Sequence, residues 1–183
     1  MRGKSLMKKI LLGSLLVMAA GARAADSAAT VAPAAPPPAS AALDWLAGGV
    51  WTAALPPDQK GNVTKIELTV THPETRQGLR FDSAFVIGGQ RRPYTSGMYA
   101  WNAAKQKFAI FYTDSSGSLS AGDVTPAEGV FVHEFTATDR AGKVENIRVR
   151  LTHDSATTFT NEIFVEQDGA WAKIVSVKYE RPG

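Results

Sequence analysis

The sequence predicts an all-β protein, an antiparallel up-and-down meander of about ten strands closed into a barrel. Short runs rich in β-branched and aromatic residues recur about every 8–12 residues, with turn residues between them. No helical periodicity follows residue 50. Strands joined by short turns pair as neighbours, and closing the meander into a barrel removes its exposed edges. A β-sandwich is the alternative architecture.

The first 24 residues have the pattern of a secretory signal peptide. A basic start (MRGKSLMKK) precedes an apolar run of 11 residues (ILLGSLLVMAA), which is too short to span a bilayer as a helix. Small residues at Ala22 and Ala24 fit a cleavage site after Ala24. We therefore expect a periplasmic or extracellular protein whose mature form has no integral membrane segment.

Residues 25–41 are rich in Ala, Pro and Ser and predict a disordered linker, so residues 42–183 form the single barrel domain. The chain contains no cysteine, which excludes disulfides. Five of its 20 Lys and Arg and none of its 17 Asp and Glu lie in the signal peptide, so the net charge of +3 becomes −2 for residues 25–183. This balance gives no reason to expect nucleic-acid binding.

The individual strands are predicted from alternation of apolar and polar residues. In VTKIELTV, Ile66, Leu68 and Val70 share one face, and a short helical turn with a first strand precedes this run. DG at 168–169 is a hairpin signal before the last strand. The predicted strands span residues 50–54, 63–70, 78–87, 95–101, 107–114, 119–124, 130–138, 144–152, 157–167 and 170–179.

Three motifs resemble those of lipocalin-like calycin barrels. LDWLAGGVW (43–51) reads as a helical turn followed by Gly-x-Trp, MYAWNAAKQKFAIFYTDSSGSLSAGDV (98–124) as a strand–turn–strand passage, and IFVEQDGAWAKIVSVKYER (163–181) as a closing hairpin. Together they are similar to the uncharacterised bacterial DUF1579-like lipocalin-like proteins. In calycins the Gly-x-Trp indole plugs one barrel end under an Arg from the last strand. The resemblance assigns this structural role to Gly49, Trp51 and Arg181.

The candidate ligand pocket consists of four side chains, Tyr99, Trp101, Tyr112 and His133. Tyr99 and Trp101 share a strand face, and His133 alternates in phase with Phe131 and Phe135. If these faces point inward, they give an apolar interior with a few polar groups, as small-ligand sites have. The alternatives are a filled interior and a core His133 hydrogen-bonded to a hydroxyl or to Asn161.

The sequence therefore favours a secreted, non-enzymatic barrel that binds a small hydrophobic or amphipathic molecule. A scaffold barrel that binds a partner protein through its outer face is the first alternative. An enzyme that uses His133, including a haem protein, is the second alternative. The nitrobindin-like haem barrels carry their ligating His near the C-terminus, whereas no His follows His153 here, which counts against haem. No Gly-x-Ser-x-Gly elbow or metal-ligand spacing is present, so no catalytic residue, metal or cofactor is predicted. The sequence leaves the oligomeric state open.

Overall fold

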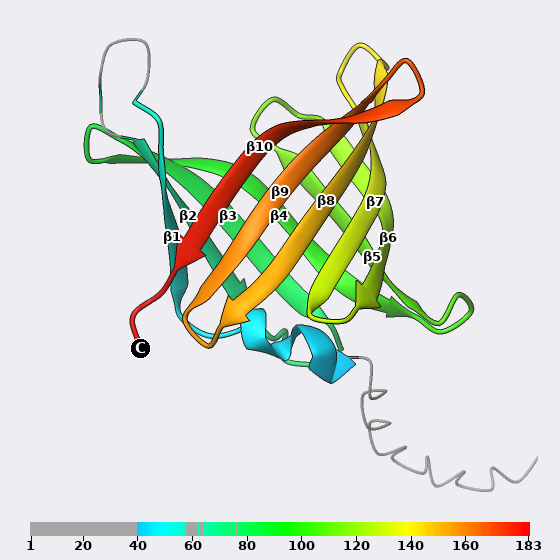
Figure 1. The fold of residues 1–183 in the computed structure, drawn as a ribbon, viewed down its shortest axis with the longest axis horizontal. Coiled ribbons are helices and arrows are strands. Elements are labelled where there is room, and N and C mark those ends of the chain that lie inside the picture. Colours follow the sequence, from blue (N-terminus) through cyan, green and yellow to red (C-terminus); the bar gives the residue numbers. More distant parts are fainter. Residues whose placement is uncertain (1–39, 58–61, 63, 76) are drawn as a thin grey trace, which may run out of the picture. The chain divides into compact units, whose positions relative to one another are not determined.

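A computed structural model describes residues 40–57, 62, 64–75 and 77–183. The predicted signal peptide and all but the last two residues of the predicted linker lie outside the described residues. The predicted fold class is confirmed, because ten antiparallel strands close into one barrel (Figure 1). The elements are η1 (Ser40–Leu46), β1 (Val50–Leu55), β2 (Thr64–Thr71), β3 (Leu79–Ile87), β4 (Gln90–Asn102), β5 (Lys107–Asp114), β6 (Leu119–Ala127), β7 (Val130–Thr138), β8 (Val144–Ser155), β9 (Thr158–Gln167) and β10 (Ala170–Glu180).

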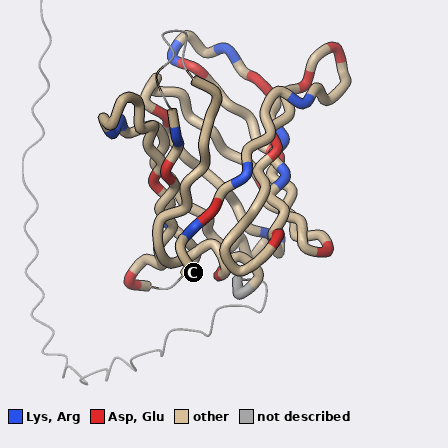
Figure 2. Tube along the Cα trace, turned by 60° about the vertical axis from the view of Figure 1, so that its left-hand side comes forward, with Lys and Arg blue, Asp and Glu red and all other residues tan. Residues whose placement is uncertain are grey.

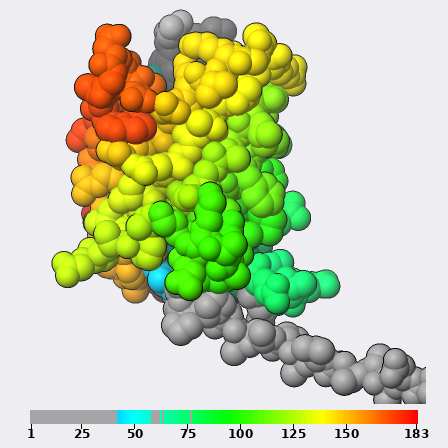
Figure 3. Space-filling view, turned by 90° about the vertical axis from the view of Figure 1, so that its right-hand side faces the viewer, coloured from blue at the N-terminus to red at the C-terminus, as the bar shows by residue number. Residues whose placement is uncertain are grey.

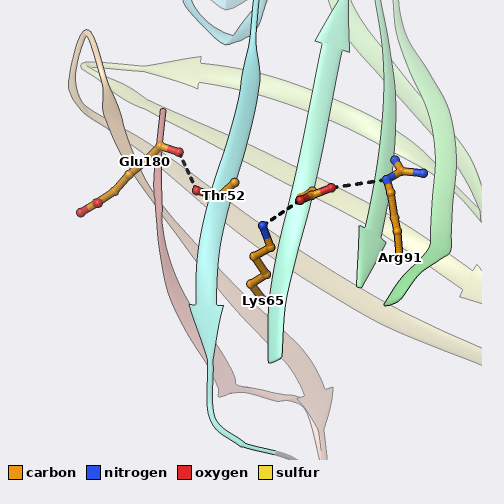
Figure 4. Close-up of polar contacts among 5 residues, drawn as sticks. Thr52, Lys65, Arg91 and Glu180 are labelled. Carbon is orange, nitrogen blue, oxygen red and sulfur yellow. Dashed lines mark hydrogen bonds and ion pairs between the residues drawn. The ribbon is translucent and has the colours of Figure 1, made fainter. Parts of the chain in front are cut away.

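Every strand pairs with its neighbours in the chain, and β1 returns to pair with β10. At this closing seam Thr52 is opposite Glu180, and the Thr52 hydroxyl donates to the Glu180 carbonyl oxygen at 3.3 Å (Figure 4). On the adjacent outer face, Glu67 lies between Lys65 and Arg91, at 3.0 and 3.3 Å (Figure 4). The closed ring rules out the β-sandwich.

The strand alternation separates an apolar interior from a charged exterior. Trp51, Phe108 and Phe159 are almost completely buried inside. Figure 2 marks positions of Lys, Arg, Asp and Glu along the strands and in the turns. Figure 3 shows the β7–β8 turn in yellow and the β9–β10 turn in orange at one end of the barrel. Among the described residues, no helix is long and apolar enough to cross a membrane.

A bulge in β10 changes which residues of this strand face the interior. The register between β10 and β9 shifts between Lys173 and Val175. Lys173 is therefore exposed, and its ammonium group bonds a Glu162 carboxylate oxygen at 3.0 Å, whereas Tyr179 further along is buried. Trp171 lies before the bulge and packs under the Arg148 guanidinium instead of in the core. One extra residue in a strand has this effect because inward and outward positions alternate.

Candidate functional site

One end of the barrel is closed by η1 and Trp51. The Trp51 side chain is completely buried, and its indole N–H donates to the Leu46 carbonyl oxygen at 2.8 Å. The Arg181 guanidinium lies 4.2 Å from the centre of the Trp51 ring and donates to the carbonyl oxygens of Ala47 and Gly48 at 3.0 and 2.8 Å. Gly48 and Gly49 both have positive φ, at 87° and 78°, which most side chains disfavour. These contacts hold the two chain segments at the closed end together.

A second aromatic contact at the closed end was not evident from the sequence. His153, which the sequence pattern places beside a turn, stacks on Trp45 with a centroid distance of 4.3 Å. Trp45 in turn meets the Trp51 ring edge-on at 6.1 Å. His72 lies 3.8 Å from an Asp44 carboxylate oxygen on the exposed side of η1. Two of the three histidines therefore belong to the closed end and not to the interior.

The interior of the barrel contains a cavity of about 190 Å³. Leu46 of η1 borders the cavity at the closed end. Tyr94 and Thr95, near the beginning of β4, border it towards the other end. Three predicted pocket residues, Tyr99, Tyr112 and His133, line this cavity together. A completely filled interior was the alternative prediction, and the cavity does not support it.

The fourth predicted residue, Trp101, lies outside the set that lines the cavity. It shares the inward face of Tyr99 but is two residues closer to the β4–β5 turn, which joins strands at the closed end. There it packs edge-on against Phe108, opposite it on β5, at a centroid distance of 5.4 Å. Alternation therefore predicts the face of this residue but not its depth in the barrel.

His133 is the most deeply buried polar residue of the cavity wall, with 2% of its surface exposed. The Tyr99 ring packs edge-on against the His133 imidazole at 5.5 Å. Burial lowers the pKa of His133 to about 3, because the apolar surroundings disfavour the charged ring. Its Nε2 has no hydrogen-bond partner in the described structure, so the expected core pairing with a hydroxyl or with Asn161 is not formed at this atom.

Asn161 of β9 is the cavity residue that the sequence analysis named only as a possible partner of His133. It lies in phase with Phe159 and Ile163, which also line the cavity. The Asn161 side chain hydrogen-bonds Tyr179, but its buried Oδ1, like His133 Nε2, has no hydrogen-bond partner among the described residues. Its position in phase with Phe159 and Ile163 could have identified Asn161 as an inward residue. Its neighbours Thr160 and Glu162 are also polar, however, so the alternation of apolar and polar residues is unclear at this point of the sequence.

Several other polar side chains of the cavity have partners within its wall. The Ser83 and Thr95 hydroxyls hydrogen-bond each other, and the Thr95 amide donates to Ser83 Oγ at 3.2 Å. Burial raises the pKa of Tyr112, and a side-chain hydrogen bond with Ser120 opposes this effect. Burial likewise raises the pKa of Tyr99, so the phenols stay protonated. Among the fully buried side-chain atoms of the described cavity wall, His133 Nε2 and Asn161 Oδ1 are the two that have no hydrogen-bond partner.

Apart from His133, no acidic or basic side chain borders the cavity within the described parts of the chain. The charged groups pair on the outside instead, as Arg80 with Asp82 at 3.2 Å and Arg148 with Glu134 at 2.6 Å. The outer wall also exposes apolar side chains, and 42% of Phe111 and 53% of Leu119 are accessible. Both border a shallow groove over β4 and β5, the surface that a partner-binding barrel would use.

The site does not fit a haem. A cavity of about 190 Å³ is smaller than the roughly 300–1,000 Å³ that drug-sized ligands occupy, and a haem is a large ligand on that scale. His133, the only cavity histidine among the described residues, is confined under the Tyr99 ring. Among the described residues, no three His, Asp or Glu side chains are grouped so that they could hold a metal ion.

Comparison with known proteins shows the fold. No protein-family model matches the chain, and no curated protein matches it. The chain is similar to the crystal structure of Rv2717c from M. tuberculosis, with a TM-score of 0.53 and 12% identity, over 81% of this chain and 100% of that one. At this identity the likeness concerns the barrel alone.

Proposed function

We propose that this protein binds one small apolar or amphipathic molecule inside its barrel and has no catalytic activity. The observation that carries the proposal is the cavity of about 190 Å³, lined by Tyr99, Tyr112 and His133 and by aliphatic side chains. An apolar cavity of about 150 Å³ suffices to bind benzene in another protein, so a molecule with one or two rings is a suitable size. The lipocalin-like motifs of the sequence support the same class of function.

We expect the protein of residues 25–183 to bind benzene and naphthalene with measurable affinity, because both remove apolar surface from water. Chemical shifts of the ¹⁵N-labelled protein locate the probe, and shifts centred on Tyr99 and His133 are expected. Ile163→Phe adds volume to the cavity wall and should weaken binding at least tenfold. Ile174→Phe is the matched control, because 54% of Ile174 is exposed and its side chain does not line the cavity.

A lipid panel and a larger hydrophobic fluorophore complete the experiment. Binding of these molecules without the single-ring probes would mean that the barrel opens further than its present cavity. If no molecule of either set bound, the ligand-binding function would be wrong.

The proposal includes export to the periplasm or the extracellular space. It is supported by the basic, apolar and small-residue segments of residues 1–24. Expression of the full chain should give an exported product, and N-terminal sequencing should begin at Ala25. A cytoplasmic product that keeps residues 1–24 would contradict this part of the proposal without affecting the cavity.

A further inference from the structure

Two buried polar atoms in the cavity have no partner in the described structure. His133 Nε2 and Asn161 Oδ1 both face the interior of the barrel, and His133 is 98% buried. Buried polar atoms in folded proteins almost always have a hydrogen-bond partner, and an unpartnered one reduces stability. Two of them in one cavity therefore indicate a place where an occupant supplies hydrogen bonds.

The two atoms belong to one side of the barrel. Val149 of β8 pairs with His133 of β7 on one side and with Ile163 of β9 on the other. Asn161 lies two residues before Ile163 and shares its inward face. In the ring of ten strands, β3 stands opposite β8. On that opposite side, β2 contributes Ile66, Leu68 and Val70, and β3 contributes Phe81 and Ser83. Ser83 is hydrogen-bonded to Thr95, so the unpartnered polar atoms lie on the β7–β9 side and the opposite side is mainly apolar. This arrangement would orient an amphipathic molecule.

The charge of the wall restricts the occupant further. His133 is the one acidic or basic residue among the described lining residues, and burial holds its imidazole in the neutral form at physiological pH. A buried charge needs an opposite charge or several hydrogen bonds to replace its hydration. A carboxylate would find no cation here, and its oxygens would meet Asn161 Oδ1, which only accepts hydrogen bonds.

We propose that the cavity selects a small uncharged molecule with an N–H or O–H group, such as a phenol, an alcohol or an amide. Its polar group donates to Asn161 Oδ1 or interacts with His133 Nε2, and its apolar part packs against β2 and β3. This inference rests on the proposed ligand-binding function, and it excludes fatty-acid anions and organic cations as preferred ligands.

Two pairs of probes with similar shapes test this selectivity by titration calorimetry. Phenol and toluene differ mainly in a hydroxyl, and benzamide and benzoate differ in charge and in the N–H donor. We expect phenol to bind at least tenfold more tightly than toluene, and benzamide at least tenfold more tightly than benzoate. Equal affinities within the first pair, or tighter binding of benzoate, would overturn the inference.

Variants identify the atoms responsible. Asn161→Leu should reduce the phenol affinity to that of toluene, whereas Asn146→Leu, on the outer face of β8 where Asn146 bonds Glu166, should leave it unchanged. His133→Phe should also reduce the preference for phenol, with His153→Phe as its control at the Trp45 stack. An unchanged preference in both Asn161→Leu and His133→Phe would contradict the assignment.

The outcomes separate this inference from the function it rests on. Toluene binding without a preference for phenol would overturn the selectivity but leave a ligand-binding barrel. Failure of all four probes to bind the wild-type protein would overturn the inference, and the proposed function would fall with it only if benzene, naphthalene, the fluorophore and the lipid panel did not bind either. If Asn161→Leu or His133→Phe did not fold, as judged by circular dichroism, the comparison of probes on the wild-type protein would still decide.

Discussion

Replacing Trp51 with alanine should lower the free energy of unfolding by about 3–5 kcal/mol, the range for large aromatic truncations in a core. The completely buried indole packs against Phe159 at a centroid distance of 4.9 Å and fixes η1 through its bond to the Leu46 carbonyl. Its loss also removes the surface on which Arg181 rests. Urea unfolding, followed by circular dichroism, measures the change as a shift of the midpoint.

Trp171→Ala is the matched control. Trp171 also lies under an arginine, since the Arg148 guanidinium is 4.2 Å from its ring centre, but it is on the outer wall. An exposed cation–π contact contributes about 0.5–1 kcal/mol, so this variant should lose no more than about 1 kcal/mol. Equal losses in the two variants would mean that Trp51 has no special role in closing the barrel.

Replacing His133 with leucine should make the protein less sensitive to acid. Burial lowers the pKa of His133 to about 3 in the folded protein, while the unfolded chain has a His pKa near 6.5. Between these values the unfolded state binds the proton and the folded state does not, so stability falls as the pH falls from about 6.5 towards 3. The slope approaches about 1.4 kcal/mol per pH unit, which gives about 2.5 kcal/mol between pH 6 and pH 4.

The difference in unfolding free energy between His133→Leu and the wild-type protein isolates this effect. Carboxylates with lowered pKa values, such as those of Glu67 and Asp114, also lose their stabilising interactions in acid, but both proteins contain them. Near pH 7 the variant should match or exceed the wild-type stability, because it removes an unpartnered buried nitrogen. A difference that stays constant from pH 6 to pH 4 would show that His133 titrates normally and is not buried.

Strand alternation and turn residues were sufficient to predict the barrel, and they grouped Tyr99 with Trp101 and His133 with Phe131 and Phe135, but they left open whether these faces point inward. Alternation repeats every two residues, so it cannot tell how deep a side chain lies along the barrel axis, and Trp101 illustrates this limit. It also fails where a strand has an extra residue, as between Lys173 and Val175. The free atoms of His133 and Asn161 depend on contacts between distant strands, which one sequence does not reveal.

The seam between β1 and β10 has a consequence for how the chain folds. Nine of the ten strand pairs join neighbours in the sequence, whereas Thr52 and Glu180 are 128 residues apart. Bringing distant segments together costs more chain entropy than closing a hairpin, and such contacts slow folding. The hairpins can therefore form early and independently, and the rate-limiting step is expected to be the meeting of the two ends, after which Arg181 fastens them over Trp51.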